Sequence, residues 1–549
     1  MASGSIRQPL RILLLPTRPG NEATCAKALK RALTDLNVTS ADFGHWIDLQ
    51  LQTWRNSGTA NKELQRTVQS VINAALADGS PAVVDQGNRL AKNYFGLHSK
   101  LMYEHLMSHE EATALLSHAF LIAHLADYER LTAAQIANVL SQRDGRATFS
   151  RQNVLTVLKT MGINVDFTKA QLIALYHRDA RQELAVLSDS DFITSAELVA
   201  EAGIKLGAQS DLLGALKTLA PKIKQDSLDS RYTPYLQMLH YQCVIAEFVD
   251  HAVTDIYEFN PRGEKFTWLQ KKYPHTIAGA KNAFLNNAKS VETLDIGWVR
   301  SKKRGRPGAM ALLNILESME AMGFSARREL AWWFRLWLHR VIRIAETTPL
   351  PLPAVITRNQ IENLITAIGR GNTKTFGILE QRLLDAVAAT IHKGWRPKGL
   401  RDPVNATNIS TAKLGDCDFI DVATTSLIAY ESHGGKLSAV YVDQHLATIE
   451  KTLSRRIDEL TAVADIGDWK VSIKFIAHTV DPDIPQQIEI GGLALNIITD
   501  TFANFFANNI QFDDEYFYHA VQEYLLTPLR AQRTPNEVRM KLMQLIGNE

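Results

Sequence analysis

The 549-residue sequence has few cysteines and no long apolar run. Its three cysteines, Cys25, Cys243 and Cys417, lie far apart and form no CxxC pair, which argues against a disulfide framework or a cysteine-based zinc site. A reducing, cytoplasmic setting is therefore expected. No stretch of about 18 apolar residues is present, so we predict no transmembrane helix and no membrane partner. The apolar run before Pro16 is too short for a secretory signal, which needs about 7–15 apolar residues.

Net charge and the common nucleotide-binding motifs are also lacking. The 60 Lys and Arg residues nearly balance the 58 Asp and Glu residues, and a net charge of +2 means that any contact with nucleic acid must come from local patches. No GxGxxG or Walker pattern follows Leu10–Leu15, which we predict to be a buried strand. The length is enough for two to four domains.

The most informative segment is Gly415–Lys436, which reads GDCDFIDVATTSLIAYESHGGK. Its β-branched and aromatic residues predict two short strands, Gly415–Ala423 and Ser426–His433, joined by a Thr-Thr turn.

Acidic side chains in this segment are spaced so that they can converge. Because side chains alternate faces along a strand, Asp416 and Asp418 are expected on one face, and Glu431 and His433 on one face of the next strand. A divalent cation needs such hard oxygen ligands close together, with open positions for water and phosphate. The alternative is that these acids are ordinary turn residues and solvated strand residues.

This pattern resembles the restriction-endonuclease-like nucleases, the PD-(D/E)xK superfamily. In that family an acid on one strand and an acid-x-base pair on the next hold magnesium beside the scissile phosphate. The segment Gly415–Asp418 resembles the first element, and Glu431-Ser432-His433 occupies the acid-x-base place. A predicted helix at Gly377–Thr390 contains Glu380, where several members have a further acid.

The predicted elements around the motif follow the order of the superfamily core. After the helix and the two acidic strands come a helix over Tyr441–Leu460 and a strand over Lys470–Ala477. The resemblance covers roughly Asn372–Thr479, about a fifth of the chain. It implies that Asp418 and Glu431 hold Mg²⁺, with Asp416 or Glu380 as a further ligand.

The sequence departs from the family at one position, where His433 stands in place of the usual lysine. An imidazole differs from an ammonium group in charge and in hydrogen bonding. Three interpretations stay open. His433 orients the attacking water or stabilises charge, or Lys436 reaches in from the Gly-Gly loop, or the site is inactive.

The segment Leu131–Met161 is typical of a helix-turn-helix or winged-helix unit. Thr132 is predicted to cap a first helix and Ser150 a second. The first turn of that second helix contains Arg151-Gln152-Asn153, residue types that bind guanine and adenine. The alternative is an ordinary helical pair, because the connection is longer than the usual three or four residues.

Basic residues are densest in the stretch DIGWVRSKKRGRPG, which contains Arg300, Lys302, Lys303, Arg304 and Arg306. The sequence RGRP is the core of an AT-hook, in which arginines lie along a narrow minor groove. We predict phosphate or groove contact here, and the alternative is a solvated basic loop.

These observations predict a mainly α protein with a C-terminal α/β domain. The expected domains are a mostly helical one at 1–128, a helical DNA-binding region at 129–346, and a restriction-endonuclease-like domain at 347–549, after a proline-rich connector. A strand over Ile488–Ile498 and helices over Asp513–Leu526 and Pro535–Ile546 close the chain.

The expected function is that of a Mg²⁺-dependent endodeoxyribonuclease, a hydrolase acting on double-stranded DNA. The resemblance implies a role in restricting foreign DNA, a homodimer that cuts both strands, and companion methyltransferase or defence subunits. The alternative is a non-catalytic DNA-binding or assembly protein with a degenerate nuclease-like domain.

Overall fold

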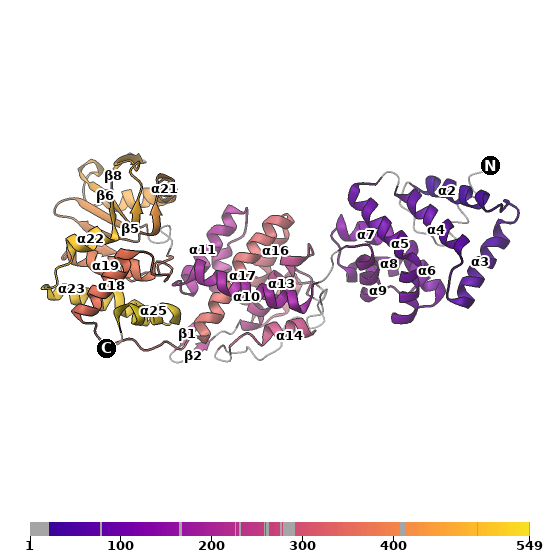
Figure 1. Cartoon of the computed structure of the whole chain (residues 1–549), viewed down its shortest axis with the longest axis horizontal. Coiled ribbons are helices and arrows are strands. Elements are labelled where there is room, and N and C mark those ends of the chain that lie inside the picture. The colour runs from indigo at the N-terminus through magenta and orange to yellow at the C-terminus, as the bar shows by residue number, and fades with distance from the viewer. Residues whose placement is uncertain are drawn as a thin grey trace. The chain divides into compact units, whose positions relative to one another are not determined.

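The computed structural model describes residues 21–547, apart from 77–78, 164–166, 225–226, 230–231, 257–258, 260–262, 275–276, 278–290, 292, 407–411 and 491. The predicted strand Leu10–Leu15 lies outside the described residues. Most of the described chain is helical, with a small mixed sheet in its C-terminal part (Figure 1). This confirms the prediction of a mainly α protein with a C-terminal α/β part.

The chain forms two compact units whose limits differ from the predicted boundaries at 128 and 346. Unit 1 contains Met1–Leu172, Val244–Thr267 and Ser290–Asp295. Unit 2 contains the remaining segments, Ile173–Cys243, Trp268–Lys289 and Ile296–Glu549.

The helices of unit 1 that precede residue 161 are α2 (Glu22–Asp35), α3 (Phe43–Ser57), α4 (Lys62–Ala75), α5 (Pro81–Glu104), α6 (His109–Ser117), α7 (Ala119–Asp127), α8 (Ala133–Arg143) and α9 (Arg151–Thr160). One hydrophobic core runs through all of them, from Cys25 to Met161. The pair α8 and α9 is therefore part of the N-terminal core, and no boundary falls at residue 128.

Helix α10 (Lys169–Leu187) begins in unit 1 and continues in unit 2. It is followed by α11 (Phe192–Lys205), α12 (Leu212–Leu219), β1 (Lys222–Lys224), β2 (Ser227–Asp229), α13 (Thr233–Phe248), α14 (Glu264–Gln270), α15 (Ile296–Ser301), α16 (Arg306–Glu320) and α17 (Phe324–Glu346). Strands β1 and β2 pair antiparallel.

The elements after the prolines are α18 (Arg358–Arg370), α19 (Ile378–Ile391), β3 (Arg396–Lys398), β4 (Cys417–Asp421), β5 (Ser426–Leu437), α21 (Ala439–Thr461), η2 (Ile466–Asp468), β6 (Lys470–Val480), β7 (Gln487–Ile490), β8 (Leu493–Thr501), α22 (Phe502–Asn509), α23 (Glu515–Ala520), the π-helical turn η3 (Val521–Leu526), α24 (Thr527–Arg530) and α25 (Asn536–Ile546).

Buried ion pairs join these elements to the helices before the prolines. Arg382 of α19 pairs at 2.8 Å with Asp189, which follows α10, and both side chains are buried. The Thr534 hydroxyl donates to the same carboxylate at 3.0 Å. The segments on both sides of residue 346 therefore share one compact unit.

Within the described residues, six strands form one sheet in the order β3-β4-β5-β6-β8-β7. Strands β3, β4 and β5 are antiparallel neighbours, whereas β5 and β6 are parallel and are connected through α21. The predicted order of helix, two acidic strands, helix and strand is present as α19, β4, β5, α21 and β6, with the short strand β3 added.

Helices cover both faces of the sheet. On one face, Phe419 and Tyr430 pack with α18, α19 and the C-terminal helices. On the other, Leu427 and Ala429 pack against the apolar stripe of α21. The alternation of buried side chains along β5 thus assigns successive residues to opposite layers.

Two predictions about the C-terminal elements were wrong in detail. The segment Ile488–Ile498 is two antiparallel strands, β7 and β8, because the chain reverses beside Gly492, whose φ of 81° is left-handed. The helix predicted over Asp513–Leu526 begins at Glu515, with the Asp514 side chain as its cap.

Candidate functional site

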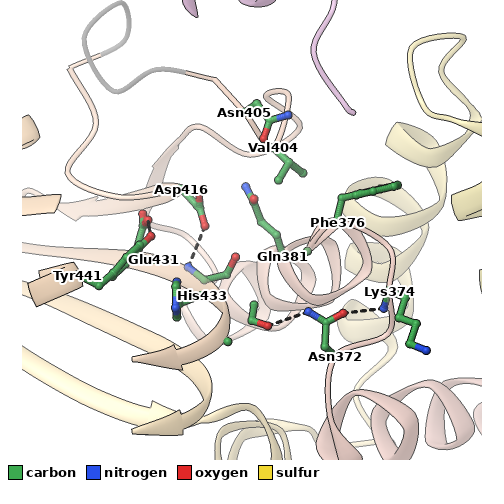
Figure 2. Close-up of a pocket in the computed structure, with 14 residues that line it drawn as sticks. Asn372, Lys374, Phe376, Gln381, Val404, Asn405, Asp416, Glu431, His433 and Tyr441 are labelled. Carbon is green, nitrogen blue, oxygen red and sulfur yellow. Dashed lines mark hydrogen bonds between the residues drawn. The ribbon is translucent and has the colours of Figure 1, made fainter. Parts of the chain in front are cut away.

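The two acids Asp416 and Glu431 lie at one pocket, Asp416 directly before β4 and Glu431 within β5. Cys417 of β4 pairs with Tyr430 of β5, so the next residues toward the pocket, Asp416 and Glu431, are brought opposite each other. Asp416 accepts a hydrogen bond from the Ser432 backbone N–H at 2.8 Å. The pocket has a volume of about 590 Å³, and both acids line it (Figure 2).

The glycine before the first acid is required by this close approach. A Cβ at Gly415 would lie 2.4 Å from the Tyr430 carbonyl oxygen, which is closer than real Cβ atoms come to any atom. Glycine therefore lets the backbone that carries Asp416 run directly against β5.

The electrostatic environments of the two acids differ. Burial and the nearby Glu431 carboxylate raise the pKa of Asp416 to about 8. Burial also acts to raise the pKa of Glu431, but the His445 imidazolium and hydrogen bonds from His445 and Tyr441 outweigh it and lower that pKa. One acid is thus held ionised while its neighbour resists ionisation.

The charge of Glu431 is stabilised by α21. The Tyr441 hydroxyl donates to Glu431 Oε1 at 2.9 Å, and His445 Nδ1 lies 3.3 Å from the same oxygen. His445 Nε2 donates to the Leu414 carbonyl at 3.0 Å. Burial opposes the charge on His445, but Glu431 and these hydrogen bonds raise its pKa to about 9. His445 is therefore protonated at neutral pH and fixes the Glu431 side chain.

The donor set of this pocket fits a hard divalent cation. A cation between Asp416 and Glu431 would relieve the repulsion between two like charges. The described residues contain no group of three or more His, Cys, Asp or Glu side chains suited to a metal. An ion here would take two carboxylates from the protein and its other oxygens from water or phosphate, as Mg²⁺ commonly does.

Of the two candidate replacements for lysine, only His433 lines the pocket. Its ring packs on Tyr441 with the centroids 4.0 Å apart, and burial lowers its pKa, so it is neutral at pH 7. Lys436 is exposed and pairs at 2.8 Å with Asp481. In this arrangement the imidazole, not the ammonium group, faces the pocket.

The prediction that Asp418 is a metal ligand is corrected by its surroundings. Asp418 is fully buried beside α21, its Oδ1 lies 2.7 Å from Arg456 Nη2, and its Oδ2 accepts from the Leu414 N–H at 3.3 Å. It is not among the pocket residues. Its carboxylate is neutralised inside the protein and serves the packing of β4 on α21.

Glu380, predicted as a further acid of the site, is likewise directed away from the pocket. Its Oε1 accepts from the N–H and the hydroxyl of Thr373, both at 2.9 Å, and its Oε2 accepts from the Thr375 hydroxyl at 3.3 Å. The side chain is fully buried. Glu380 therefore holds the loop between α18 and α19, and its neighbour Gln381 lines the pocket.

The predicted helix pair of the DNA-binding region is present, and its caps are as expected. Thr132 caps α8 and Ser150 caps α9 through capping boxes. In the second box, Asn153 Oδ1 accepts from the Ser150 N–H, while Nδ2 donates to the Thr148 carbonyl at 2.8 Å.

Asn153 is therefore buried as a cap, and its predicted role in reading bases is corrected. Gln152 is exposed and Arg151 is partly buried at the start of the same helix.

The basic stretch does not have the extended shape that an AT-hook requires. Arg300 lies in α15 and Arg306 opens α16, and Arg306 Nη2 donates to the Arg300 carbonyl at 3.3 Å. Lys303 and Arg304 are exposed between the helices. Lys302 is partly buried, with its Nζ 5.4 Å from the centroid of the Trp298 ring. These residues span the end of α15, the connection after it and the start of α16, which is not the extended RGRP arm of an AT-hook.

Sequence reasoning missed most of the residues around the two acids, among them Gln381 and Tyr441 at the pocket and His445 beside Glu431. Tyr441 and His445 are four apart on a helix, a spacing that places both on the face turned toward β5. That spacing was a usable signal, whereas nothing in the sequence distinguishes Gln381 from Glu380.

No protein-family model matches this chain, and no curated protein matches its sequence at a significant level. None of the helices in the described residues is both long enough and apolar enough to span a bilayer.

Proposed function

We propose that the chain is a metal-dependent DNA endonuclease of restriction type. The observation that carries the proposal is the placement of Asp416 and Glu431 opposite each other at one pocket, with His433 two residues further along β5. The order α19, β4, β5, α21 and β6 supports it, since that is the order expected of the restriction-endonuclease-like core.

In the proposed reaction, Asp416 and Glu431 are the residues that would hold Mg²⁺ beside a phosphodiester. Bound Mg²⁺ would lower the pKa of a coordinated water and stabilise charge on the phosphate. Neutral His433 would accept a proton from the attacking water as the water oxygen forms the new P–O bond. The bond from phosphorus to the oxygen of the leaving strand breaks, and that oxygen takes a proton from solvent. Tyr441 and His445 keep Glu431 ionised and in one orientation.

DNA contact is proposed for two sets of surface residues, one in each unit, of which Arg151 is partly buried and the others are exposed. Arg151 and Gln152 begin α9 in unit 1, and Arg300, Lys303 and Arg304 form a basic surface in unit 2. Contacts of this kind release counterions, so binding should weaken steeply as salt is raised.

The proposed setting is a reducing cytoplasm, since all three cysteines are free and buried. Restriction of foreign double-stranded DNA, a homodimer and companion methyltransferase or defence subunits belong to the same proposal. They follow from the resemblance alone.

A second candidate is a DNA-binding or assembly protein whose nuclease-like domain has lost its chemistry. Two observations favour it: the histidine in place of the usual lysine, and a protein-supplied ligand set of only two carboxylates in the described residues. The two candidates differ in whether binding is followed by cleavage.

The test is cleavage of plasmid and phage DNA in Mg²⁺, with EDTA as a control. Asp416→Asn and Glu431→Gln should abolish cleavage. Asp421→Asn is the matched control, because Asp421 is an acid at the opposite end of β4. Binding without cleavage in Mg²⁺ or Mn²⁺ would favour the second candidate, and equal cleavage by Asp416→Asn would contradict the assigned site.

A further inference from the structure

The wall of the pocket that faces the acids carries polar and aromatic groups that the proposed hydrolysis does not use. It is formed by the loop between α18 and α19, by the first turn of α19 and by Val404 and Asn405. Figure 2 shows Gln381 directed into this space. Within the residues that the structure describes, the Gln381 amide, the Lys374 ammonium and the Phe376 ring have no hydrogen-bonding, ionic or aromatic partner.

Gln381 is the most informative of these groups. The residue is only 2% exposed, yet its side-chain amide has no partner among the described residues, and it lines the pocket. At the same wall, the Nδ2 atom of Asn405 is buried without a hydrogen-bond partner in the described part of the chain, whereas the Gln381 amide is open to the pocket. A buried polar group left unpaired is costly, so the Asn405 amide, with the Gln381 amide beside it, points to a ligand that offers donors and acceptors.

Phe376 is held at the rim of the pocket by a strained loop. Phe376 has φ of 58° and Lys374 has φ of 61°, a region that side-chain-bearing residues rarely adopt. Hydrogen bonds hold the loop. The Thr373 hydroxyl donates to the buried Glu380 carboxylate, and Asn372 Nδ2 donates to the Gly434 carbonyl at 2.8 Å. The loop thus keeps a large aromatic ring 39% exposed beside the pocket.

We propose that this wall receives a single unstacked nucleobase next to the scissile phosphate. Phe376 stacks on the face of the base, and the amides of Gln381 and Asn405 bind its edge. Lys374 meets a neighbouring phosphate. Amide groups match the paired donors and acceptors of base edges, and aromatic rings stack on any base. This inference rests on the proposed nuclease function.

The consequence concerns the class of substrate. A base inside a duplex has both faces covered by its neighbours and cannot offer one to Phe376. The substrate therefore presents either a single-stranded segment or a base turned out of a duplex. In both cases the wall binds the same group, a base with an exposed face, and the choice of oligonucleotide probe tells the two cases apart.

The experiment measures the affinity of the full chain for fluorescein-labelled oligonucleotides by anisotropy, in EDTA so that no metal-dependent cleavage occurs. The probes are a single strand, the matched duplex, and the same duplex with one mismatch. The wild type should bind the single strand or the mismatched duplex more tightly than the matched duplex. Preference for the single strand indicates a strand segment, and preference for the mismatch indicates a base turned out of the duplex.

Variants of the wall should weaken this binding selectively. Phe376→Ala should reduce affinity for the preferred probe about five- to hundred-fold, and Gln381→Leu about ten-fold. Phe376→Tyr keeps the ring and should bind as the wild type does. The control Val422→Ala changes an apolar residue that is 42% exposed at the turn between β4 and β5, and it should have no effect.

Unchanged affinity in Phe376→Ala and Gln381→Leu, equal binding of all three probes, or no binding of any probe would overturn the inference. The outcomes separate it from the proposed function. Cleavage in Mg²⁺ with unaltered binding by both variants would refute the base site alone. Variant-sensitive binding without any cleavage would refute the nuclease alone.

Discussion

The buried pair of Asp418 and Arg456 separates a structural acid from the acids of the site. Asp418 is completely buried and Arg456 is 1% exposed, with 2.7 Å between their charged atoms. Removing one partner of such a pair leaves the other charge buried, which costs about 3–5 kcal/mol. Arg456 retains a second partner, Glu459 at 2.6 Å, so we expect Asp418→Ala to lower the free energy of unfolding by about 3 kcal/mol.

Asp416→Asn should behave in the opposite way. Asparagine can still accept the hydrogen bond from the Ser432 N–H, and burial and Glu431 already keep Asp416 largely uncharged at neutral pH. We expect the free energy of unfolding to change by less than about 1 kcal/mol and DNA cleavage to fall at least about 100-fold.

Urea denaturation followed by circular dichroism gives the stabilities of both variants, and plasmid cleavage in Mg²⁺ gives their activities. The control is Asp421→Asn, which should leave both quantities unchanged. The reasoning is refuted if Asp418→Ala is as stable as the wild type but inactive, while Asp416→Asn stays active.

Three further predictions concern packing and pH. Burial and the charge of a nearby histidine lower the pKa of His98 from 6.5 to about 4, so below pH 6.5 the unfolded chain binds more protons than the folded chain. Unit 1 should therefore lose up to about 3 kcal/mol of its free energy of unfolding as pH falls from 6.5 to about 4. Urea unfolding measures this loss, and the loss should be absent in His98→Phe. Gly415→Ala should destabilise unit 2 by about 1–3 kcal/mol, because its methyl group would meet the Tyr430 carbonyl; a melting temperature equal to the wild type's would contradict this. Asp189→Ala removes the 2.8 Å partner of the buried Arg382 guanidinium, which keeps Asp385 at 3.0 Å, and should cost about 3 kcal/mol; unchanged hydrogen exchange in α19 would count against that role.

Much of the C-terminal fold follows from local sequence patterns. The strand predicted at Lys470–Ala477 and the helix predicted at Tyr441–Leu460 correspond to β6 and α21. These predictions succeed because one face of each element packs on the core, so that apolar residues alternate along the strand and form a stripe along the helix. The turn at Gly492 was misread, since a glycine pair is compatible with both a kinked strand and a reversal of the chain.

The choice between the two aspartates could not be made from sequence. Asp416 and Asp418 are two apart on one strand, so alternation treats them alike. What separates them is the pairing of Cys417 with Tyr430 and the position of Arg456 on α21, thirty-eight residues further along the chain. The same limit applies to Asn153, whose side chain is directed inward by the local capping box.

The domain limits also depended on contacts between distant residues. The proline-rich connector after α17 suggested a boundary, since proline favours extended linkers. The Arg382–Asp189 pair joins residues 193 positions apart, and no local pattern announces it. From sequence alone, charged residues such as these are predicted to be solvent-exposed, but in the structure they form a buried ion pair.

The most direct test of the central claim is a titration of Mn²⁺ into the protein without DNA, followed by the electron paramagnetic resonance signal of the free ion. It does not require knowledge of the DNA target. The wild type and Asp421→Asn should bind one ion, and Asp416→Asn and Glu431→Gln should bind it at least about ten-fold more weakly. No binding by the wild type, or equal binding by all four proteins, would contradict a cation site formed by Asp416 and Glu431.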